Sequence, residues 1–113
     1  MNQLDYRLTL TLFSKKKCFG PGPMMLLKGV ENTGSLQKSA AEMGMAYSKA
    51  WKMIRELEDV WGFALLYRQS GGVNGGGSIL TKEGKTLLKK YQAMLADIEK
   101  SAEESFKKHF GED

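Results

Sequence analysis

The residues best suited to binding chemistry form a polar cluster in the middle of the chain. Two hydroxyls and three cations follow one another at helical spacing: Tyr47, Ser48, Lys49, Lys52 and Arg55. Hydroxyl, ammonium and guanidinium groups are the donors that contact phosphate oxygens and base edges in DNA. Their types and spacing therefore predict one edge of a helix that enters the major groove.

The same inventory gives little support to catalysis or metal binding. Cys18 is the only cysteine and His109 the only histidine, so a zinc site of these residue types lacks ligands. The carboxylates form no pair that helices would bring together, and Glu56, Glu58 and Asp59 are expected at the surface. We therefore expect no enzyme, no cofactor and no metal.

The polar cluster needs a rigid support, and the stretch from Gly34 to Glu58 predicts two short helices joined by a turn. Ser35 can cap the first helix with its hydroxyl, and Gly44 suits the left-handed turn that ends it. In the second helix, apolar residues recur every three or four positions and predict a buried face. The apolar residues of the two helices are Leu36, Ala40 and Met43, then Ala50, Ile54, Leu57 and Trp61. A helix-turn-helix is therefore expected over about residues 35–61.

Further elements are predicted on both sides of the helix-turn-helix. Residues 4–13, LDYRLTLTLF, alternate apolar and polar side chains, which predicts a strand that pairs elsewhere. A proline-led helix from Met24 to about Thr33 should complete a three-helix core. Short strands at 64–68 and 79–81 flank the glycine-rich residues 70–78, which predicts a hairpin, or wing, beside the helix-turn-helix.

The glycine-rich stretch has two other interpretations. A nucleotide-binding loop needs Lys-Ser or Lys-Thr before a helix, and a dinucleotide site needs a strand, a turn and a helix. In this chain a strand is expected after the glycines, so a phosphate-cradling enzyme is disfavoured. A surface loop without a function remains the alternative to a wing that approaches the sugar-phosphate backbone.

Thr81 is expected to cap a last helix that spans about residues 82–110 and is on the order of 40 Å long. Its apolar residues step by three and four, as in a coiled-coil seam. A small domain cannot cover a helix of this length, so we expect its far half to pack on a second copy. The predicted homodimer interface consists of Leu8, Leu10, Leu88, Tyr91, Leu95, Ile98, Ala102 and Phe106.

Length and charge set the outer limits. The 113 residues predict one winged helix-turn-helix domain over 1–113, mainly α with a small β component, with the wing at about 64–81. The net charge is +4, of which the segment 35–55 carries +3, and this clustering favours a polyanionic partner. No apolar run is long enough to span a membrane and no secretory leader follows Met1, so we expect a cytoplasmic protein.

These residues resemble the LysR-type winged helix-turn-helix family. The resemblance is carried by Ser35-Leu36, Ala40, Met43-Gly44, Ser48, residues 54–58, Gly62, Leu65-Leu66, Arg68 and residues 80–84. Within this family, residues 47–51, the glycine-rich wing and the N-terminal strand are similar to the DNA-binding domain of the molybdate-responsive ModE-type regulators. The resemblance covers about residues 4–110.

The resemblance implies a sequence-specific transcription regulator that binds a near-palindromic DNA site as a homodimer, through its first and last elements. The residues implied to touch DNA are the polar cluster above, Ser35 and Gln37 at phosphates, and Asn74, Gly75, Gly76 and Gly77 at the flanking backbone or minor groove. Trp51 could stack on a base, but its position at the apolar edge favours the core.

Some features of the family are not carried over. ModE-type regulators have molybdate-binding domains after this one, whereas this sequence ends at Asp113. Molybdate sensing is therefore not implied, and a ligand at the dimer interface, a separate effector-sensing protein or no effector all remain open. The alternative function is a winged-helix module for protein interaction, for which DNA binding would be incidental.

Overall fold

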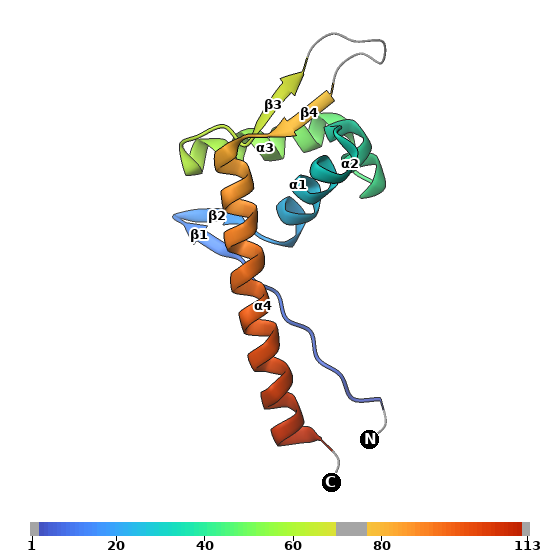
Figure 1. The fold of residues 1–113 in the computed structure, drawn as a ribbon, viewed down its shortest axis with the longest axis vertical. Helices are drawn as coiled ribbons and strands as arrows, with labels where there is room; N and C mark the ends of the chain where they lie inside the picture. The colour runs from blue at the N-terminus through green and yellow to red at the C-terminus, as the bar shows by residue number, and fades with distance from the viewer. Residues whose placement is uncertain (1–2, 70–76, 112–113) are drawn as a thin grey trace.

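A computed structural model describes residues 3–69 and 77–111 of the chain (Figure 1). Within these residues the protein is mainly helical with a small β component, as predicted, and the β component consists of two antiparallel hairpins. The helices before residue 62 form the upper body in Figure 1, and the longer last helix extends away from it. The elements are β1 (Leu12–Ser14), β2 (Lys16–Phe19), α1 (Pro21–Thr33), α2 (Leu36–Glu42), α3 (Tyr47–Trp61), β3 (Leu66–Gln69), β4 (Gly77–Leu80) and α4 (Lys82–Phe110).

The ends of α1, α2 and α3 follow from their capping residues. Pro21 is the first residue of α1, which therefore begins before the predicted Met24, because the missing N–H of proline would be unpaired there anyway. The Ser35 hydroxyl caps α2 by accepting a hydrogen bond from the Lys38 N–H at 3.0 Å. Gly34 and Gly62 follow α1 and α3 at φ 72° and 82°, a left-handed conformation that glycine adopts readily.

The three helices enclose one apolar core, to which the hairpins and α4 also contribute. Leu26 and Val30 of α1, and Ala50 and Ile54 of α3, are almost completely buried in it. The remaining buried members of the core are Phe19, Leu27, Leu36, Ala40, Leu57, Leu65, Leu66, Leu80, Leu87, Leu88 and Tyr91. The predicted three-helix core is thus confirmed, and α4 enters it with its first turns.

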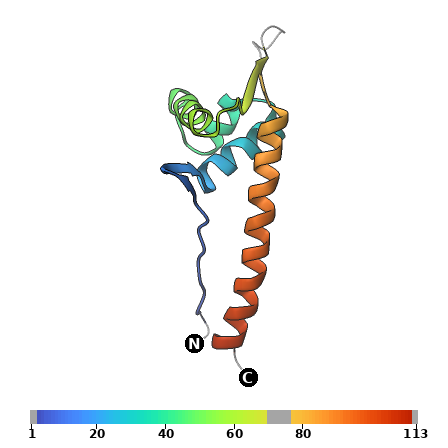
Figure 2. The ribbon, with the colours of Figure 1, turned by 90° about the vertical axis from the view of Figure 1, so that its left-hand side faces the viewer.

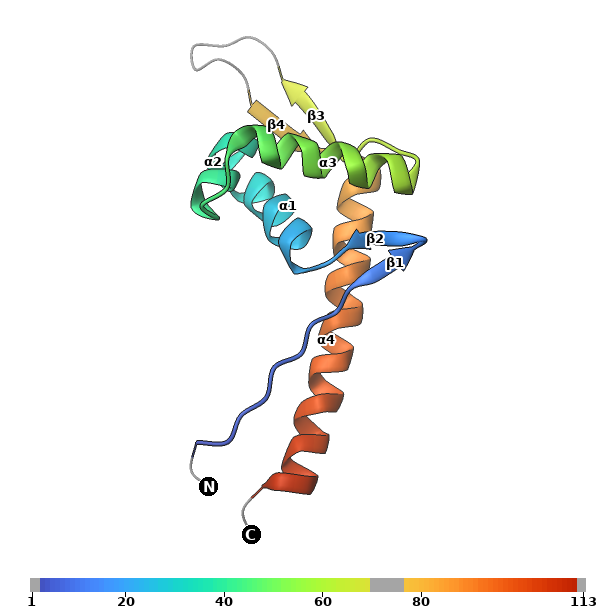
Figure 3. The same cartoon turned by 180° about the vertical axis from the view of Figure 1, so that it is seen from behind.

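The predicted strand over residues 4–13 is wrong in extent. β1 begins only at Leu12 and pairs antiparallel with β2. The turn between the two strands is at Lys15, which has φ 65°. Residues 4–11 belong to no strand in the described structure and lie extended along α4 (Figures 2 and 3). Alternation of side chains does not distinguish a strand in a sheet from an extended segment on a helix, and both occur here.

The wing is an antiparallel hairpin of β3 and β4, with Leu66 opposite Leu80. Its strands overlap the predicted ranges and are shifted slightly toward the tip, since β3 extends to Gln69 and β4 begins at Gly77. The start of β4 is joined to the helical body by a hydrogen bond of 2.9 Å from the Ser78 N–H to the Gly34 carbonyl. The tip predicted between the two strands lies outside the described residues.

α4 begins at the predicted cap, where the Thr81 hydroxyl accepts a hydrogen bond from the Gly84 N–H at 2.8 Å. One face of its first turns is buried, whereas its second half extends beyond the helical body (Figure 2). The extents of 60 × 30 × 21 Å and the radius of gyration of 17.2 Å reflect this shape, because a compact chain of this length has about 13 Å. No helix among the described residues is both long and apolar enough to cross a membrane.

Candidate nucleic-acid interface

One side of α3 is polar and open to solvent. Tyr47, Ser48, Lys49, Lys52 and Arg55 are all exposed along it, and we call these five residues the groove face. The opposite side of the same helix is buried in the core. The structure thus brings the five predicted residues together on one helix, which begins at Tyr47 and lies across the helical body (Figure 1).

No carboxylate in the described part of the chain forms a salt bridge with a cation of the groove face. Among the described residues, the salt bridges are Lys28 to Glu31 and Lys107 to Glu103, each at 3.9 Å, in α1 and α4. The N-cap of α3 is Ala46, which has no side chain to bond the first N–H groups, and no acidic residue lies in the first turn. Positive charge and free donors therefore meet at the start of α3.

The two predicted phosphate-binding residues lie at the start of α2. Gln37 is exposed, and Ser35 is half-buried. The Ser35 oxygen already accepts a hydrogen bond from the Lys38 N–H, so its O–H proton is the group that remains to donate. These two residues lie on a different helix from the groove face, as the helix-turn-helix arrangement requires.

Arg68 of β3 joins the wing to the groove face, and the sequence-based set of DNA-contacting residues did not include it. Its Nη2 donates a hydrogen bond to the Tyr47 hydroxyl at 3.2 Å. Its guanidinium carbon lies 5.2 Å from the centre of the Trp51 ring, a cation–π distance. Alternation from the buried Leu66 places Arg68 on the strand face toward α3, and this signal could have identified it.

Trp51 lies between the core and the groove face. The side chain is half-buried and packs against the core, which agrees with the preferred interpretation from the sequence. Its other side faces two cations, because the Arg55 guanidinium carbon lies 5.7 Å from the ring centre, in addition to Arg68. Tyr47 meets the same indole edge to face, with ring centres 6.4 Å apart.

Of the four predicted wing residues, Asn74, Gly75 and Gly76 lie outside the described residues, and Gly77 is described. Gly77 begins β4, opposite Gln69 at the end of the strand pair nearest the tip, and a Cβ there would collide with the Gly34 carbonyl oxygen. A glycine here lets β4 approach the end of α1 closely. This packing explains the residue type without a contact to DNA.

The eight residues predicted for a dimer interface are in different environments. Leu88 and Tyr91 are buried in the core of the chain itself, and Leu10 and Leu95 are half-buried against it. Leu8 is exposed on the extended N-terminal segment. The others, Ile98, Ala102 and Phe106, are half-buried on the projecting half of α4.

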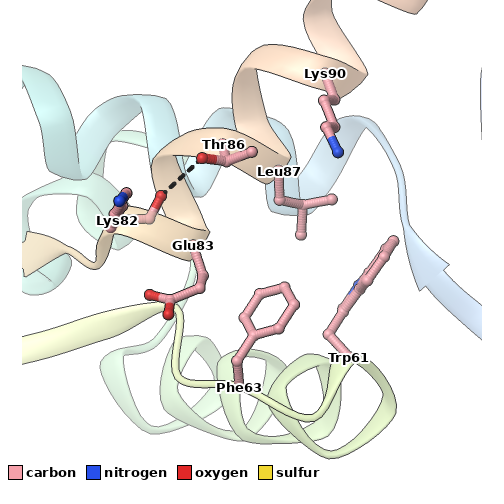
Figure 4. A pocket seen from close by; sticks show the side chains of 7 residues that line it. All are labelled: Trp61, Phe63, Lys82, Glu83, Thr86, Leu87 and Lys90. Atoms are coloured by element: carbon pink, nitrogen blue, oxygen red, sulfur yellow. Dashed lines mark hydrogen bonds between the residues drawn. The ribbon is translucent and has the colours of Figure 1, made fainter.

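A pocket of about 350 Å³ lies at the other end of α3 from Tyr47 (Figure 4). Trp61 and Phe63 form one wall and face Leu87 and Lys90 of α4 across it. The Trp61 N–H donates a hydrogen bond of 2.8 Å to the Cys18 carbonyl of β2. Among the described residues, none of those predicted to contact DNA lines this pocket.

A buried three-helix core, a polar second helix of a helix-turn-helix and an adjacent β-hairpin together define the winged helix-turn-helix class. The comparison with known families specifies this further. The sequence profile of the bacterial regulatory helix-turn-helix proteins of the LysR family matches residues 24–85, and the chain belongs to this family. The family is one of regulatory proteins rather than enzymes.

Several characterised relatives resemble most of the chain. It is 35% identical to the DNA-binding transcriptional dual regulator ModE of Escherichia coli (strain K12) over 100 residues, 88% of this chain and 38% of the relative. It is 34% identical to the transcriptional regulator ModE of Yersinia pestis over 105 residues, 92% of this chain and 40% of the relative. The molybdenum-pterin-binding protein MopB of Rhodobacter capsulatus is 31% identical over 81 residues. The chain therefore spans less than half the length of these relatives.

Proposed function

We propose that the protein is a sequence-specific DNA-binding transcription regulator, and that α3 is its recognition helix. The observation that carries this proposal is the groove face, an exposed row of hydroxyls and of cations that form no salt bridge with the described residues, on the second helix of a helix-turn-helix. Tyr47, Ser48 and Lys49 belong to the first turn of α3, and the N-terminal residues of a recognition helix contact the base edges. The names of the ModE relatives, which describe transcriptional regulators, support the same function.

The proposed contacts come from three parts of the molecule: α3, the start of α2 and the wing. Lys49, Lys52 and Arg55 provide cations for phosphates or for guanine edges in the major groove. Ser35 and Gln37 at the start of α2 hold the neighbouring phosphate backbone, and the wing lies over the adjacent backbone or minor groove. A protein-binding surface in this position would be expected to have apolar aromatic anchors, whereas the groove face is mainly cationic and polar.

The test is selection of bound DNA from a random pool, followed by a salt titration of the affinity for the selected site. We expect affinity to fall steeply with salt. Lys52→Ala should weaken binding and reduce the slope of log K against log salt by about one unit. If Lys52 reads a guanine, the preference at one base pair should also relax, by about 1–3 kcal/mol.

Lys100→Ala is the matched control, because Lys100 is also exposed but lies on the projecting half of α4. It should leave both the affinity and the salt slope unchanged. Binding without salt dependence, or equal effects of the two substitutions, would contradict the proposal. Capture of a protein partner with indifference to DNA sequence would favour the alternative of an interaction module.

The proposal includes a homodimer that binds a near-palindromic site, with its two recognition helices about 34 Å apart. Ile98, Ala102 and Phe106 continue the apolar stripe of α4 beyond the core, where the rest of the chain covers them only in part. The only described neighbour of this stretch is the extended N-terminal segment, through a hydrogen bond of 2.9 Å from Tyr6 to Glu103 and a ring contact with Phe106. A second copy would bury the stripe.

Solution mass tests the dimer directly. Ile98→Glu places a charge in the proposed interface, so we expect it to produce monomers at concentrations at which the wild type is dimeric. Lys100→Glu introduces the same residue on the opposite side of α4 and should not change the mass. A monomeric wild type, or selected DNA without two half-sites, would refute this part of the proposal.

A further inference from the structure

Three side chains meet where the wing adjoins the recognition helix. Tyr47 and Trp51 lie one turn apart on α3, and Arg68 reaches them from β3. The Arg68 guanidinium donates to the Tyr47 oxygen at 3.2 Å and stacks over the Trp51 ring at 5.2 Å. Arg55 lies against the same indole, at 5.7 Å from its centre, without a hydrogen bond to the phenol among the described contacts.

The hydrogen bond from Arg68 determines what the Tyr47 hydroxyl can still do. A phenol has one proton to donate and an oxygen that accepts. Arginine remains charged at all ordinary pH values and has only donors, so the Tyr47 oxygen must be the acceptor in this pair. The phenol proton then points away from Arg68, and Tyr47 is 39% exposed at the start of α3.

The pKa of Tyr47 agrees with this geometry. Two groups lower the pKa of the phenol below its ordinary value: the Trp51 N–H has the larger effect and the Arg68 hydrogen bond the smaller. The Trp51 N–H meets no acceptor with hydrogen-bond geometry in the described part of the chain, so it acts on the phenol as a nearby dipole and not through a hydrogen bond. A phenol polarised in this way is a stronger hydrogen-bond donor.

We infer that Arg68 and Trp51 position the Tyr47 hydroxyl as a hydrogen-bond donor to an acceptor atom of DNA, so that the wing orients a contact made by the recognition helix. This inference rests on the proposed function and deepens it. The contact selects acceptors, such as guanine O6 and N7, adenine N7, thymine O4 or a phosphate oxygen, and disfavours the amino groups of adenine and cytosine. Arg68 is a positioning residue in this arrangement.

A double-mutant cycle tests the inference. The variants are Tyr47→Phe, Arg68→Lys and the two combined, with affinities measured on the selected DNA site at one salt concentration. Arg68→Lys keeps the charge but cannot form the planar stack, and Tyr47→Phe removes only the hydroxyl. We expect each single change to weaken binding about threefold to tenfold, the range of one hydrogen bond. In the Tyr47→Phe background, Arg68→Lys should cost less than about twofold, because there is no hydroxyl left to position.

Arg55→Lys is the matched control, because Arg55 faces the same indole without bonding the phenol. Its effect should be the same whether or not the Tyr47 hydroxyl is present. Thermal unfolding of each variant, followed by circular dichroism, checks that the fold is kept. Base preference identifies the acceptor: Tyr47→Phe should relax one base pair if the acceptor is a base, and weaken all sequences equally if it is a phosphate.

The outcomes separate the inference from the proposed function. The inference alone is overturned if the wild-type protein binds DNA but Arg68→Lys weakens binding equally with and without the Tyr47 hydroxyl. It is also overturned if Arg68→Lys does not weaken binding at all. Wild-type protein that binds no DNA overturns the proposed function and the inference with it. Coupling between positions 47 and 68, with additive behaviour of Arg55→Lys, supports both.

Discussion

Thr81→Val should lower the free energy of unfolding markedly, although valine has nearly the same shape as threonine. The Thr81 side chain is buried at the junction of the wing and α4, with 1% of its surface exposed. Its hydroxyl accepts a hydrogen bond from the Gly84 N–H at 2.8 Å and donates one to the Ala64 carbonyl at 2.6 Å. It therefore caps α4 and also ties it to the segment that leads into β3. Valine fits the same space and forms neither bond.

The magnitude follows from these two bonds. Loss of an N-cap side chain costs about 1 kcal/mol, and loss of a second buried hydrogen bond costs about as much again. We therefore expect the free energy of unfolding to fall by about 2 kcal/mol. Thr86→Val is the matched control, because Thr86 is exposed and its hydroxyl only donates to the Lys82 carbonyl of its own helix, at 3.0 Å (Figure 4). That change should cost less than about 0.5 kcal/mol.

Urea unfolding at one fixed protein concentration measures both variants. A fixed concentration is needed because association of two chains would shift the midpoint by mass action. We expect a lower midpoint for Thr81→Val with an unchanged m-value, which indicates lost stability rather than a changed unfolded state. If Thr81→Val costs no more than Thr86→Val, the two hydroxyl bonds do not hold this junction and the reasoning is refuted.

Two further predictions concern α1 and the anchoring of the N-terminal segment. Gly29→Ala should destabilise the protein in thermal unfolding, because a Cβ would collide with the Ser39 side chain. Gly22→Ala is the control in the same helix. A Cβ there meets open space, so this change should be neutral or stabilising by up to about 1 kcal/mol. Burial raises the pKa of Tyr91, whose hydroxyl donates to the Leu10 carbonyl at 2.7 Å. The unfolded state therefore loses its proton first, near pH 10, and the stability that Tyr91 contributes should be complete below that pH and decline above it. In unfolding measured against pH, the advantage of the wild type over Tyr91→Phe should shrink above pH 10; a constant advantage would contradict this.

The helix-turn-helix could be predicted from the sequence because its determinants are local. The cap at Ser35, the left-handed turn at Gly44, with φ 68°, and the spacing of Ala50, Ile54 and Leu57 each act within a few residues. The groove face followed from the same periodicity, since the residues opposite a buried stripe must be exposed. Local rules of this kind need no knowledge of the rest of the fold.

The N-terminal hairpin could not be predicted in the same way. Its turn places a lysine, Lys15, at positive φ, and lysine is not a residue type that indicates such a turn. The seam of α4 shows another limit. Leu88 and Tyr91 belong to the same stripe as Ile98 and Phe106, but the chain's own core already buries the first pair. Periodicity shows that a face is apolar and does not show what covers it.

Contacts between distant residues hold α3 in place at both ends. At its start, Arg68 of the wing bonds Tyr47. At its end, the Trp61 N–H bonds the Cys18 carbonyl of β2, and the Glu58 carboxylate accepts from the Leu65 N–H at 2.7 Å.

These three bonds join α3 to the wing, to the N-terminal hairpin and to the loop before β3. No sequence pattern connects their partners, so the periodicity of α3 predicted only a surface position for Glu58. A recognition helix fixed by its neighbours before it meets DNA loses little further freedom on binding. Its orientation is therefore a property of the whole fold, and only its chemistry can be read from α3 alone.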